Sequence, residues 1–295
     1  MDWKAEMNEY IEMINKALDD YIILTEEPNA IVLESMKYSL FAGGKRLRPV
    51  LMLAVCGMLG KKPAVALPYA CALEMIHTYS LIHDDLPAMD DDETRRGKPT
   101  NHIVYGEGVA ILAGDGLLNR AFEIMTDNTL TLEEPMHGLK AMKSIADASG
   151  VQGMIGGQTA DLQNEGKEIN DSMLSYIHHH KTGALISAAV KAGAQMAGVD
   201  DKEADQWENI GYALGTAFQI QDDLLDIEGD AAEMGKPVGS DEKNKKATYP
   251  ALYGIEKSRK KINELTQQVL EAFNPYGEKA DFLRSLTEAL VNRRS

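Results

Sequence analysis

Six aspartates in two short segments carry the clearest chemical signal in this sequence. Each segment follows an apolar, helix-compatible run, so its carboxylates are expected at the end of a buried stem, where unpaired charge is costly. Hard oxygen ligands at this density suit Mg²⁺, which is usually bound by one or two carboxylates together with substrate phosphates. The segments therefore predict a metal site for a phosphate ester. The first, DDLPAMD, holds Asp84, Asp85 and Asp90, and the second, DDLLD, holds Asp222, Asp223 and Asp226.

A run of aspartates can also be an ordinary solvated surface, and a single DDxxD segment would leave the two interpretations evenly balanced. Two such runs, each after an apolar stem, favour a functional site. Carboxylates at the C-terminal ends of helices also oppose the helix dipole, at about 0.3–1 kcal/mol each. Stability alone therefore does not explain this placement.

Basic residues beside glycine or proline occur in four segments: GGKRLRP, DETRRGKPTNH, HHHKTG and GKPVGSDEKNKKATYP. Each segment alone is typical of a surface patch. Together, in a chain with a formal net charge of −16, they predict an anion site in which local charge outweighs the global sign. The candidate anion contacts among their basic residues are Lys45, Arg46, Arg48, Arg95, Arg96, Lys98, Lys181, Lys236, Lys245 and Lys246.

Histidines give a weaker signal. The three consecutive histidines at 178–180 face different directions on a helix and cannot share one ion, so we interpret them as solvated or core residues. His77 lies seven residues before Asp84, on nearly the same helical face. Contact with a phosphate and a hydrogen-bonded core position both remain open for it. The GMIGGQTADL segment is consistent either with a close helix contact beside polar groups or with ordinary packing.

The elements that position these residues are expected to be helical. Aromatic residues make up only 6% of the 295 residues, and β-branched alternation is rare, so we expect an all-α fold. No linker-like tract divides the chain, which favours one domain over 1–295. Periodicity and break signals predict helices over 2–24, 28–42, 47–60, 64–83, 106–126, 133–149, 171–197, 201–228, 247–273 and 277–292.

The two aspartate-rich helices are predicted to face each other in one bundle, with a central cleft between their ends. Two long segments without helix signal, 86–105 and 228–246, each follow an aspartate cluster. Loops of this length in a compact domain are usually functional, so we expect them to act as lids.

Composition also excludes several classes of protein. The acidic balance argues against nucleic-acid binding. Cys56 and Cys71 lie in apolar runs and are expected to be reduced core residues. The longest apolar run, PVLMLAVCGMLG, is too short to span a bilayer, and no N-terminal segment has the form of a signal peptide. We therefore expect a cytoplasmic protein without membrane insertion.

In their order and intervals, the motifs resemble the trans-polyprenyl diphosphate synthases, most closely the bacterial farnesyl diphosphate synthases. The matching segments are GGKRLRP, LIHDDLPAMDDDETRRGKPTNH, GGQTADL, KTG, FQIQDDLLD and GKPVGSD. The resemblance covers about residues 29–295 and implies an all-α homodimer of the isoprenoid synthase type. It also implies head-to-tail joining of isopentenyl diphosphate to dimethylallyl or geranyl diphosphate, giving (2E,6E)-farnesyl diphosphate and diphosphate.

The resemblance implies a role for each matching residue. The six aspartates would hold three Mg²⁺ ions, with Mn²⁺ as an alternative, around the allylic diphosphate. Contacts to that diphosphate would come from Arg95, Lys181, Lys246 and, more weakly, Lys236. Isopentenyl diphosphate would be bound by Lys45, Arg48, His77 and Arg96. Gln219 and Thr182 would face the allylic carbon, and with Lys181 and Arg95 they form the expected catalytic group.

Departures from the family pattern are small. Glu93-Thr94 replaces a more usual Asp-Leu, and Lys245 is an alternative to Lys246 as the contacting lysine. Arg293 and Arg294 resemble a basic tail that closes over isopentenyl diphosphate in relatives.

Product length is expected to depend on Tyr79 and its neighbour Ser80, just before the first cluster. In relatives that share the two-residue insertion of DDLPAMD, an aromatic residue at this position resembles C15 producers, and a smaller one resembles C20 producers. A geranylgeranyl diphosphate synthase is therefore the alternative. A class I terpene cyclase is disfavoured by GGKRLRP and the second intact DDxxD, and a non-catalytic partner subunit by the presence of both clusters.

Overall fold

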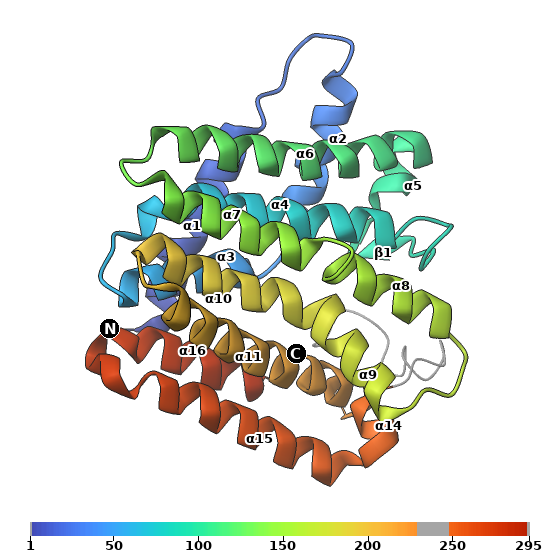
Figure 1. The fold of residues 1–295 in the computed structure, drawn as a ribbon. Coiled ribbons are helices and arrows are strands. Elements are labelled where there is room, and N and C mark those ends of the chain that lie inside the picture. Colours follow the sequence, from blue (N-terminus) through green and yellow to red (C-terminus); the bar gives the residue numbers. More distant parts are fainter. Residues whose placement is uncertain (1, 229–247, 294–295) are drawn as a thin grey trace.

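The structure is a computed structural model that describes residues 2–228 and 248–293 (Figure 1). The expected all-α fold is confirmed, because the only strands within these ranges are β1 (Thr94–Arg95) and β2 (Lys98–Pro99), which form a small antiparallel hairpin. The α-helices are α1 (Trp3–Tyr21), α2 (Ala30–Leu40), α3 (Leu47–Met58), α4 (Leu67–Asp84), α5 (Asn101–Tyr105), α6 (Glu107–Thr131), α7 (Pro135–Ser149), α8 (Met154–Asn164), α9 (Asp171–Ile177), α10 (Ala184–Ala197), α11 (Asp201–Glu228), α14 (Tyr249–Tyr253), α15 (Ile255–Ala272) and α16 (Asp281–Val291).

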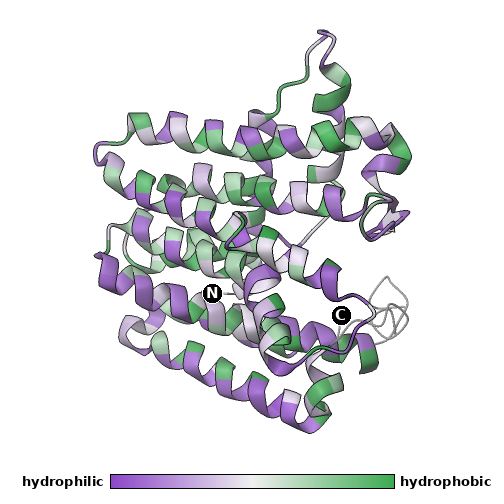
Figure 2. Ribbon diagram, turned by 45° about the vertical axis from the view of Figure 1, so that its right-hand side comes forward, coloured by the Kyte–Doolittle hydropathy of each residue, from purple (hydrophilic) through white to green (hydrophobic). Residues whose placement is uncertain are grey.

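The long helices run alongside one another in stacked layers, with α6 at the top of Figure 1 and α15 at the bottom. Between them, α4 packs on α6 and α3, and α10 packs on α3, α7 and α11. Figure 2 shows that α15, the lowest helix, is largely hydrophilic, whereas the helices above it carry more hydrophobic residues. One hydrophobic cluster draws residues from Ile14 near the N-terminus to Leu290 near the C-terminus.

Helix α4 is the buried stem of the first aspartate cluster. Pro68 stands in its first turn, where a backbone amide would have no acceptor within the helix, so proline is tolerated there. Apolar residues then occupy every face of the helix. Leu73, Met75 and Ile76 are fully buried, and each such side chain stabilises the fold by about 1.5–3 kcal/mol. The helix ends at Asp84, so its packing fixes the position of the first cluster.

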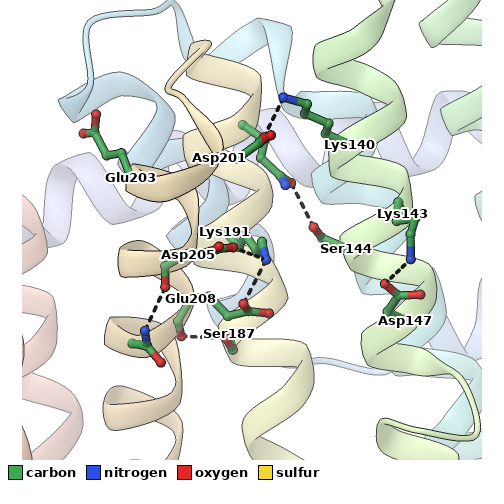
Figure 3. A network of polar contacts seen from close by, with 12 residues as sticks. Lys140, Lys143, Ser144, Asp147, Ser187, Lys191, Asp201, Glu203, Asp205 and Glu208 are labelled. Carbon is green, nitrogen blue, oxygen red and sulfur yellow. Dashed lines mark hydrogen bonds and ion pairs between the residues drawn. The ribbon is translucent and has the colours of Figure 1, made fainter.

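Helices α10 and α11 hold the second cluster against the rest of the bundle. Lys191 of α10 donates to Asp205 and Glu208 of α11 at 2.9 and 2.8 Å, and Ser187 Oγ donates to the Glu208 carbonyl (Figure 3). A Cβ on Gly215 would lie only 3.0 Å from the Gly183 Cα, so glycine permits this close approach. The contacts fix the rotation of α11 and hence the direction of its aspartates.

Some expected helices are interrupted. The segment predicted as one helix over 171–197 is α9, a π-helix at His178–Gly183 and α10. The segment predicted over 247–273 is broken at Gly254, whose φ of 81° is not helical. Short 3₁₀ turns at Pro63–Val65 and Asn274–Ala280 precede α4 and α16. These breaks redirect the chain locally and do not change the class of the fold.

Other differences lie in the segments that carried no helix signal. The expected loop at 86–105 contains the β-hairpin and α5, and α8 forms in the glycine-rich GMIGGQTADL segment, where no helix was predicted. The second expected lid, 228–246, lies outside the described residues except for Glu228. Cys56 and Cys71 are buried and free, as expected. Within residues 2–228 and 248–293, no helix combines the length and apolar character needed to cross a bilayer.

Candidate active site

The first aspartate cluster is assembled by the turn that follows α4. Asp84 is the last residue of the helix and Asp85 is its C-cap. The chain then folds back, so the Asp90 amide donates a hydrogen bond of 2.8 Å to the Asp84 carbonyl. Asp90 is thereby brought beside Asp84, although Pro87 separates it from the helix.

The carboxylates of this cluster differ in their surroundings. Burial raises the pKa of the Asp84 carboxyl to about 6, with Lys181 opposing and the charge of Asp90 adding to the shift. Asp85 is 4% exposed, and its Oδ1 accepts from Arg95 Nε at 2.7 Å and Nη2 at 2.6 Å. Asp85 and Arg95 thus form a tight ion pair beside the hairpin, whereas for Asp84 the effect of burial exceeds that of the nearby Lys181 and Arg95 charges.

The second cluster lies on α11, where Asp222 and Asp226 are four residues apart and share a face. The Asp222 side chain is 43% exposed and accepts from Arg293 Nη2 at 2.6 Å. Arg293 also lies over the Phe218 ring, 3.9 Å from its centroid. The C-terminal arginine therefore covers the exposed end of this cluster, and its expected neighbour Arg294 lies outside the described residues.

Asp223 is buried, in contrast to Asp222. Its Oδ1 accepts from Gln219 Nε2, and its Oδ2 accepts from the backbone amide of Tyr249, both at 2.9 Å. His178 Nε2 lies 3.5 Å from the same Oδ2. Burial raises the pKa of Asp223 to about 6, and the hydrogen bonds from Tyr249 and Gln219 oppose that shift.

The histidine run is explained by this packing. His179 stacks on Tyr212 and His180 on Tyr176, with centroid distances of 3.8 and 3.9 Å. The three rings therefore point to different neighbours, as expected. Sequence reasoning missed that His178 reaches the second aspartate cluster, and the π-helix that turns it inward has no simple signal in the residue pattern.

The π-helix at His178–Gly183 lies between the two clusters. Lys181 Nζ donates to Asp161 Oδ2 of α8 at 2.6 Å, and Thr182 Oγ1 donates to Gln219 Oε1 of α11 at 2.7 Å. Burial lowers the pKa of Lys181, but the charge and hydrogen bond of Asp161 outweigh burial, so its pKa is raised. Lys181 therefore stays protonated beside Asp84. It stands in a π-helix, and π-helical turns are frequent at functional sites.

Gly157 allows α8 to approach the π-helix directly. A Cβ at this position would lie 2.2 Å from the Lys181 amide nitrogen, which is backbone and cannot swing away. The first interpretation of the GMIGGQTADL segment, a close helix contact beside polar groups, is therefore confirmed, because Gly157 makes the contact and Asp161 pairs with Lys181.

We expect Gly157→Ala to lower the free energy of unfolding by about 1–3 kcal/mol, because the added methyl forces α8 and the π-helix apart. Urea titration followed by circular dichroism measures the change. Thr159→Ala is the matched control on the same helix, since Thr159 is exposed and hydrogen-bonds only within its helix. An unchanged unfolding midpoint in Gly157→Ala would contradict the close contact.

Four basic residues predicted to bind one diphosphate gather near the start of α3 and the middle of α4. Burial, and then the charges of Arg48 and Arg96, hold the pKa of His77 well below its usual range, so its ring is neutral. Burial also lowers the pKa of Lys45. Arg96 donates to the Gly43 carbonyl and packs against this glycine turn. Positive charge is therefore concentrated in this region of the unliganded protein.

Arg46 and Arg48 face opposite environments. Arg46 has a φ of 50° and turns into the core, where it donates to Glu74 Oε1, Asn15 Oδ1 and the Leu40 carbonyl at 2.9, 2.9 and 2.6 Å. Arg48 lines a cavity, and its buried Nε has no hydrogen-bond partner among the described residues. Arg46 is therefore structural, whereas Arg48 is the arginine of this motif that lines the cavity.

A cavity of about 480 Å³ lies between α4, α8 and the π-helix. Its walls combine charged groups with the apolar side chains of Met154, Ile155, Leu162 and Leu185. Sequence reasoning missed the α8 residues, because glycines lower the helix propensity of that segment. The expected site residues that line the cavity are Arg48, His77, Tyr79, Ser80, Asp84, Lys181 and Thr182.

The other expected site residues that the structure describes do not line this cavity, and four of them, Gln219, Asp222, Asp223 and Asp226, lie on α11. Asp85, Arg95 and Arg96 line a smaller hollow beside the hairpin. Lys236, Lys245 and Lys246 lie outside the described residues. In the part of the chain that the structure describes, no three acidic, histidine or cysteine side chains converge closely enough to hold a metal by themselves.

Comparison with known proteins places the chain among related sequences and folds. Residues 29–286 match the model of the polyprenyl synthetase family. A farnesyl diphosphate synthase of Geobacillus stearothermophilus is 51% identical over 87% of this chain and 86% of that protein. A geranylgeranyl diphosphate synthase of Cyanophora paradoxa is 47% identical over 90% and 88%. The apo structure of an FPP/GFPP synthase from Zymomonas mobilis superposes with a TM-score of 0.87, at 34% identity over 98% of this chain and 99% of that one.

Proposed function

The chain belongs to the polyprenyl synthetase family of prenyltransferases, and we propose that it condenses isopentenyl diphosphate with dimethylallyl and then geranyl diphosphate to give (2E,6E)-farnesyl diphosphate. The observation that carries the proposal is the cavity between α4, α8 and the π-helix. It brings Asp84, Lys181 and Arg48 together with apolar walls, which suits a diphosphate bearing a hydrocarbon tail.

Mg²⁺ fits the acidic residues. Carboxylate oxygens are its preferred protein ligands, and a bound cation would offset the burial that raises the pKa of Asp84. Because Mg²⁺ takes much of its coordination from water and substrate phosphate, two facing clusters suit it without a preformed chelate of three side chains. The aspartates proposed to hold the ions directly are Asp84, Asp85, Asp90, Asp222 and Asp226, with Mn²⁺ as a substitute; both oxygens of the sixth, Asp223, already accept hydrogen bonds. When bound, the metal would neutralise charge that develops on the leaving diphosphate.

The side chains of the protein have distinct roles in this reaction. Breaking the allylic C–O bond leaves a carbocation and diphosphate, and the protonated Lys181 stabilises the charge on the departing oxygens. Thr182 offers its hydroxyl oxygen toward the allylic carbon, whereas Gln219, predicted for the same role, accepts the hydrogen bond from that hydroxyl and does not line the cavity. The double bond of isopentenyl diphosphate attacks this carbon, and loss of one proton to the departing diphosphate completes the new bond. Apolar walls exclude water, which would otherwise convert the cation to an alcohol.

The direct test is incubation of the purified protein with labelled isopentenyl diphosphate and either dimethylallyl or geranyl diphosphate. The expected result is Mg²⁺-dependent release of diphosphate and a C15 alcohol after dephosphorylation and chromatography. Diphosphate release that does not require isopentenyl diphosphate would indicate a cyclase and contradict the proposal. A C20 product would favour the alternative, a geranylgeranyl diphosphate synthase, which the Cyanophora paradoxa relative supports.

We expect Arg48→Met to raise the Michaelis constant for isopentenyl diphosphate about 10- to 100-fold, the equivalent of one lost charge-assisted hydrogen bond of about 1.5–3 kcal/mol. The constant for the allylic substrate should change much less, because Lys181 and the aspartates contact that diphosphate. Steady-state kinetics with each substrate varied in turn measures both. Equal effects on the two constants would show that the sites are not separable.

Arg46→Met is the matched comparison, because the two arginines stand two residues apart in one motif. Removing Arg46 leaves Glu74 buried without its ion-pair partner and should cost about 3–5 kcal/mol of stability. Removing Arg48 eliminates a buried Nε that has no hydrogen-bond partner among the described residues. The melting temperature of the free protein should therefore stay the same or rise. Differential scanning fluorimetry distinguishes these outcomes.

A homodimer and a cytoplasmic location stay predictions. The dimer is supported by exposed apolar residues on α5 and α6, where Ile103, Val104, Ile111 and Leu112 are 51%, 46%, 44% and 55% exposed. Apolar side chains at this density on two adjoining helices are typical of a surface that a partner covers. Sedimentation equilibrium tests the prediction.

A further inference from the structure

The hydrogen bonds of Asp223 set it apart from its neighbour in the second cluster. Both of its oxygens accept at 2.9 Å, one from Gln219 and one from the Tyr249 amide, and its side chain is buried. Asp222 next to it is 43% exposed and pairs with Arg293, whose guanidinium a competing cation can replace. The two aspartates therefore stand in different environments although they are adjacent in sequence.

The bond from Gln219 fixes the direction of a hydrogen-bond chain. A carboxylate accepts hydrogen bonds and donates none, so Gln219 must turn its amide nitrogen toward Asp223. The carbonyl oxygen at the other end of that amide then faces Thr182, 2.7 Å from Oγ1. Because this oxygen can only accept, the Thr182 hydroxyl must donate its single proton to it. The lone pairs of Oγ1 are left for the cavity that Thr182 lines.

This direction matters for a reaction that passes through a carbocation. A hydroxyl that presents lone pairs stabilises positive charge, whereas one that presents its proton repels it, and the effect is large where water is excluded. We propose that Asp223 is a positioning residue that, through Gln219, holds the Thr182 oxygen with its lone pairs toward the allylic carbon. The inference rests on the proposed function, because it needs an allylic substrate beside Thr182.

The inference divides the work of the DDLLD segment. Asp222, whose side chain is 43% exposed, is the member that meets the metal, and Asp223 orients Thr182 toward the reacting carbon through Gln219. A rival account is that Asp223 only anchors the start of α14 through the Tyr249 amide. A second rival is that Asp223 binds the metal directly. The three accounts predict different results when Thr182 loses its hydroxyl.

The test is a double-mutant cycle with Asp223→Asn, Thr182→Val and the combined variant. Asparagine can offer an amide proton to Gln219, so the amide can turn over and the chain loses its fixed direction. We expect Asp223→Asn to lower kcat about 10- to 100-fold, with the Michaelis constant for isopentenyl diphosphate within about twofold of wild type. In the Thr182→Val background the same substitution should lower kcat by less than about threefold, because no hydroxyl remains to be oriented.

Metal binding supplies a readout that does not depend on activity. Mn²⁺ is titrated in the presence of inorganic diphosphate and followed by electron paramagnetic resonance. Asp223→Asn should bind Mn²⁺ within about threefold of wild type, whereas Asp222→Asn should bind it at least about tenfold more weakly. Equal weakening in both variants would overturn the inference in favour of a metal ligand. If Asp223→Asn lowers kcat equally with and without Thr182→Val, the inference is overturned in favour of the account in which Asp223 only anchors the start of α14.

Two further variants keep the test decisive if Asp223→Asn folds poorly. Gln219→Met removes the acceptor of the Thr182 proton and leaves Asp223 in place, so it should reproduce the loss of kcat and the dependence on the Thr182 hydroxyl. Thr182→Ser keeps the hydroxyl and should retain most activity. If the wild-type protein transfers no prenyl group, the proposed function fails. If it does and the cycle is additive, only this inference fails.

Discussion

Asp84→Ala and Asp222→Ala are each expected to lower turnover by several orders of magnitude, about 10³-fold or more, while the helical fold stays intact. Each variant removes one of the proposed oxygen ligands of the metal, so the diphosphate would lose the positive charge that makes it a leaving group. The fold should tolerate the loss of Asp84, because the free protein gains nothing from a buried carboxylate beside Asp85 and Asp90. Initial rates at saturating Mg²⁺ and far-ultraviolet circular dichroism measure the two effects.

Asp127→Ala is the matched control, since Asp127 is an exposed aspartate on α6. It should leave both turnover and stability unchanged. The thermal melt of Asp84→Ala without metal should be no lower than that of wild type, and addition of Mg²⁺ with inorganic diphosphate should raise the wild-type melt far more than that of the variant. Near-wild-type turnover in either cluster variant would reject the metal assignment.

Much of this architecture could be predicted from the residues alone. Helix α11 spans the predicted 201–228, and α3 begins at the predicted residue 47, because apolar periodicity and break signals agree there. Local sequence patterns contain no information about tertiary packing, which explains why some helices were not predicted. Helix α8 forms despite its glycines because Gly157 lets it rest on the π-helix, so a tertiary contact overrides a poor propensity.

The site was predictable in its residue types and less so in its connections. Arg46 and Arg48 look equivalent in the sequence, yet the positive φ of Arg46 turns its side chain into the core. Nothing local indicates that Lys181 pairs with Asp161, 20 positions away, or that Arg293 reaches Asp222, 71 positions away. The i to i+5 bonding of the π-helix, which directs His178 toward Asp223, also has no compositional signature.

Replacing Tyr79 with Ala or Met is expected to shift the product from C15 toward C20 or longer. In the proposed reaction the reactive carbons lie near Asp84, so the growing tail would run back along α4, and Tyr79 stands five residues earlier, about 7.5 Å along the axis. Each added isoprene unit extends the tail by roughly one helical turn, about 5.4 Å, so the ring can form a floor beneath a short chain. Tyr79 and Ser80 both line the cavity. Chromatography of the dephosphorylated products measures the shift.

Tyr79→Phe separates the ring from its hydroxyl. The hydroxyl is buried without a hydrogen-bond partner among the described residues, and burial, followed by the charge of Asp84, raises its pKa to about 12. Phenylalanine keeps the floor and removes an unsatisfied polar group, so this variant should remain a C15 producer with equal or higher stability. Methionine serves beside alanine because it fills more of the space and limits the loss of stability. If well-folded Tyr79→Ala and Tyr79→Met enzymes still stop at C15, the floor of the cavity lies elsewhere, and the α8 residues Ile155 and Leu162 become the next positions to vary.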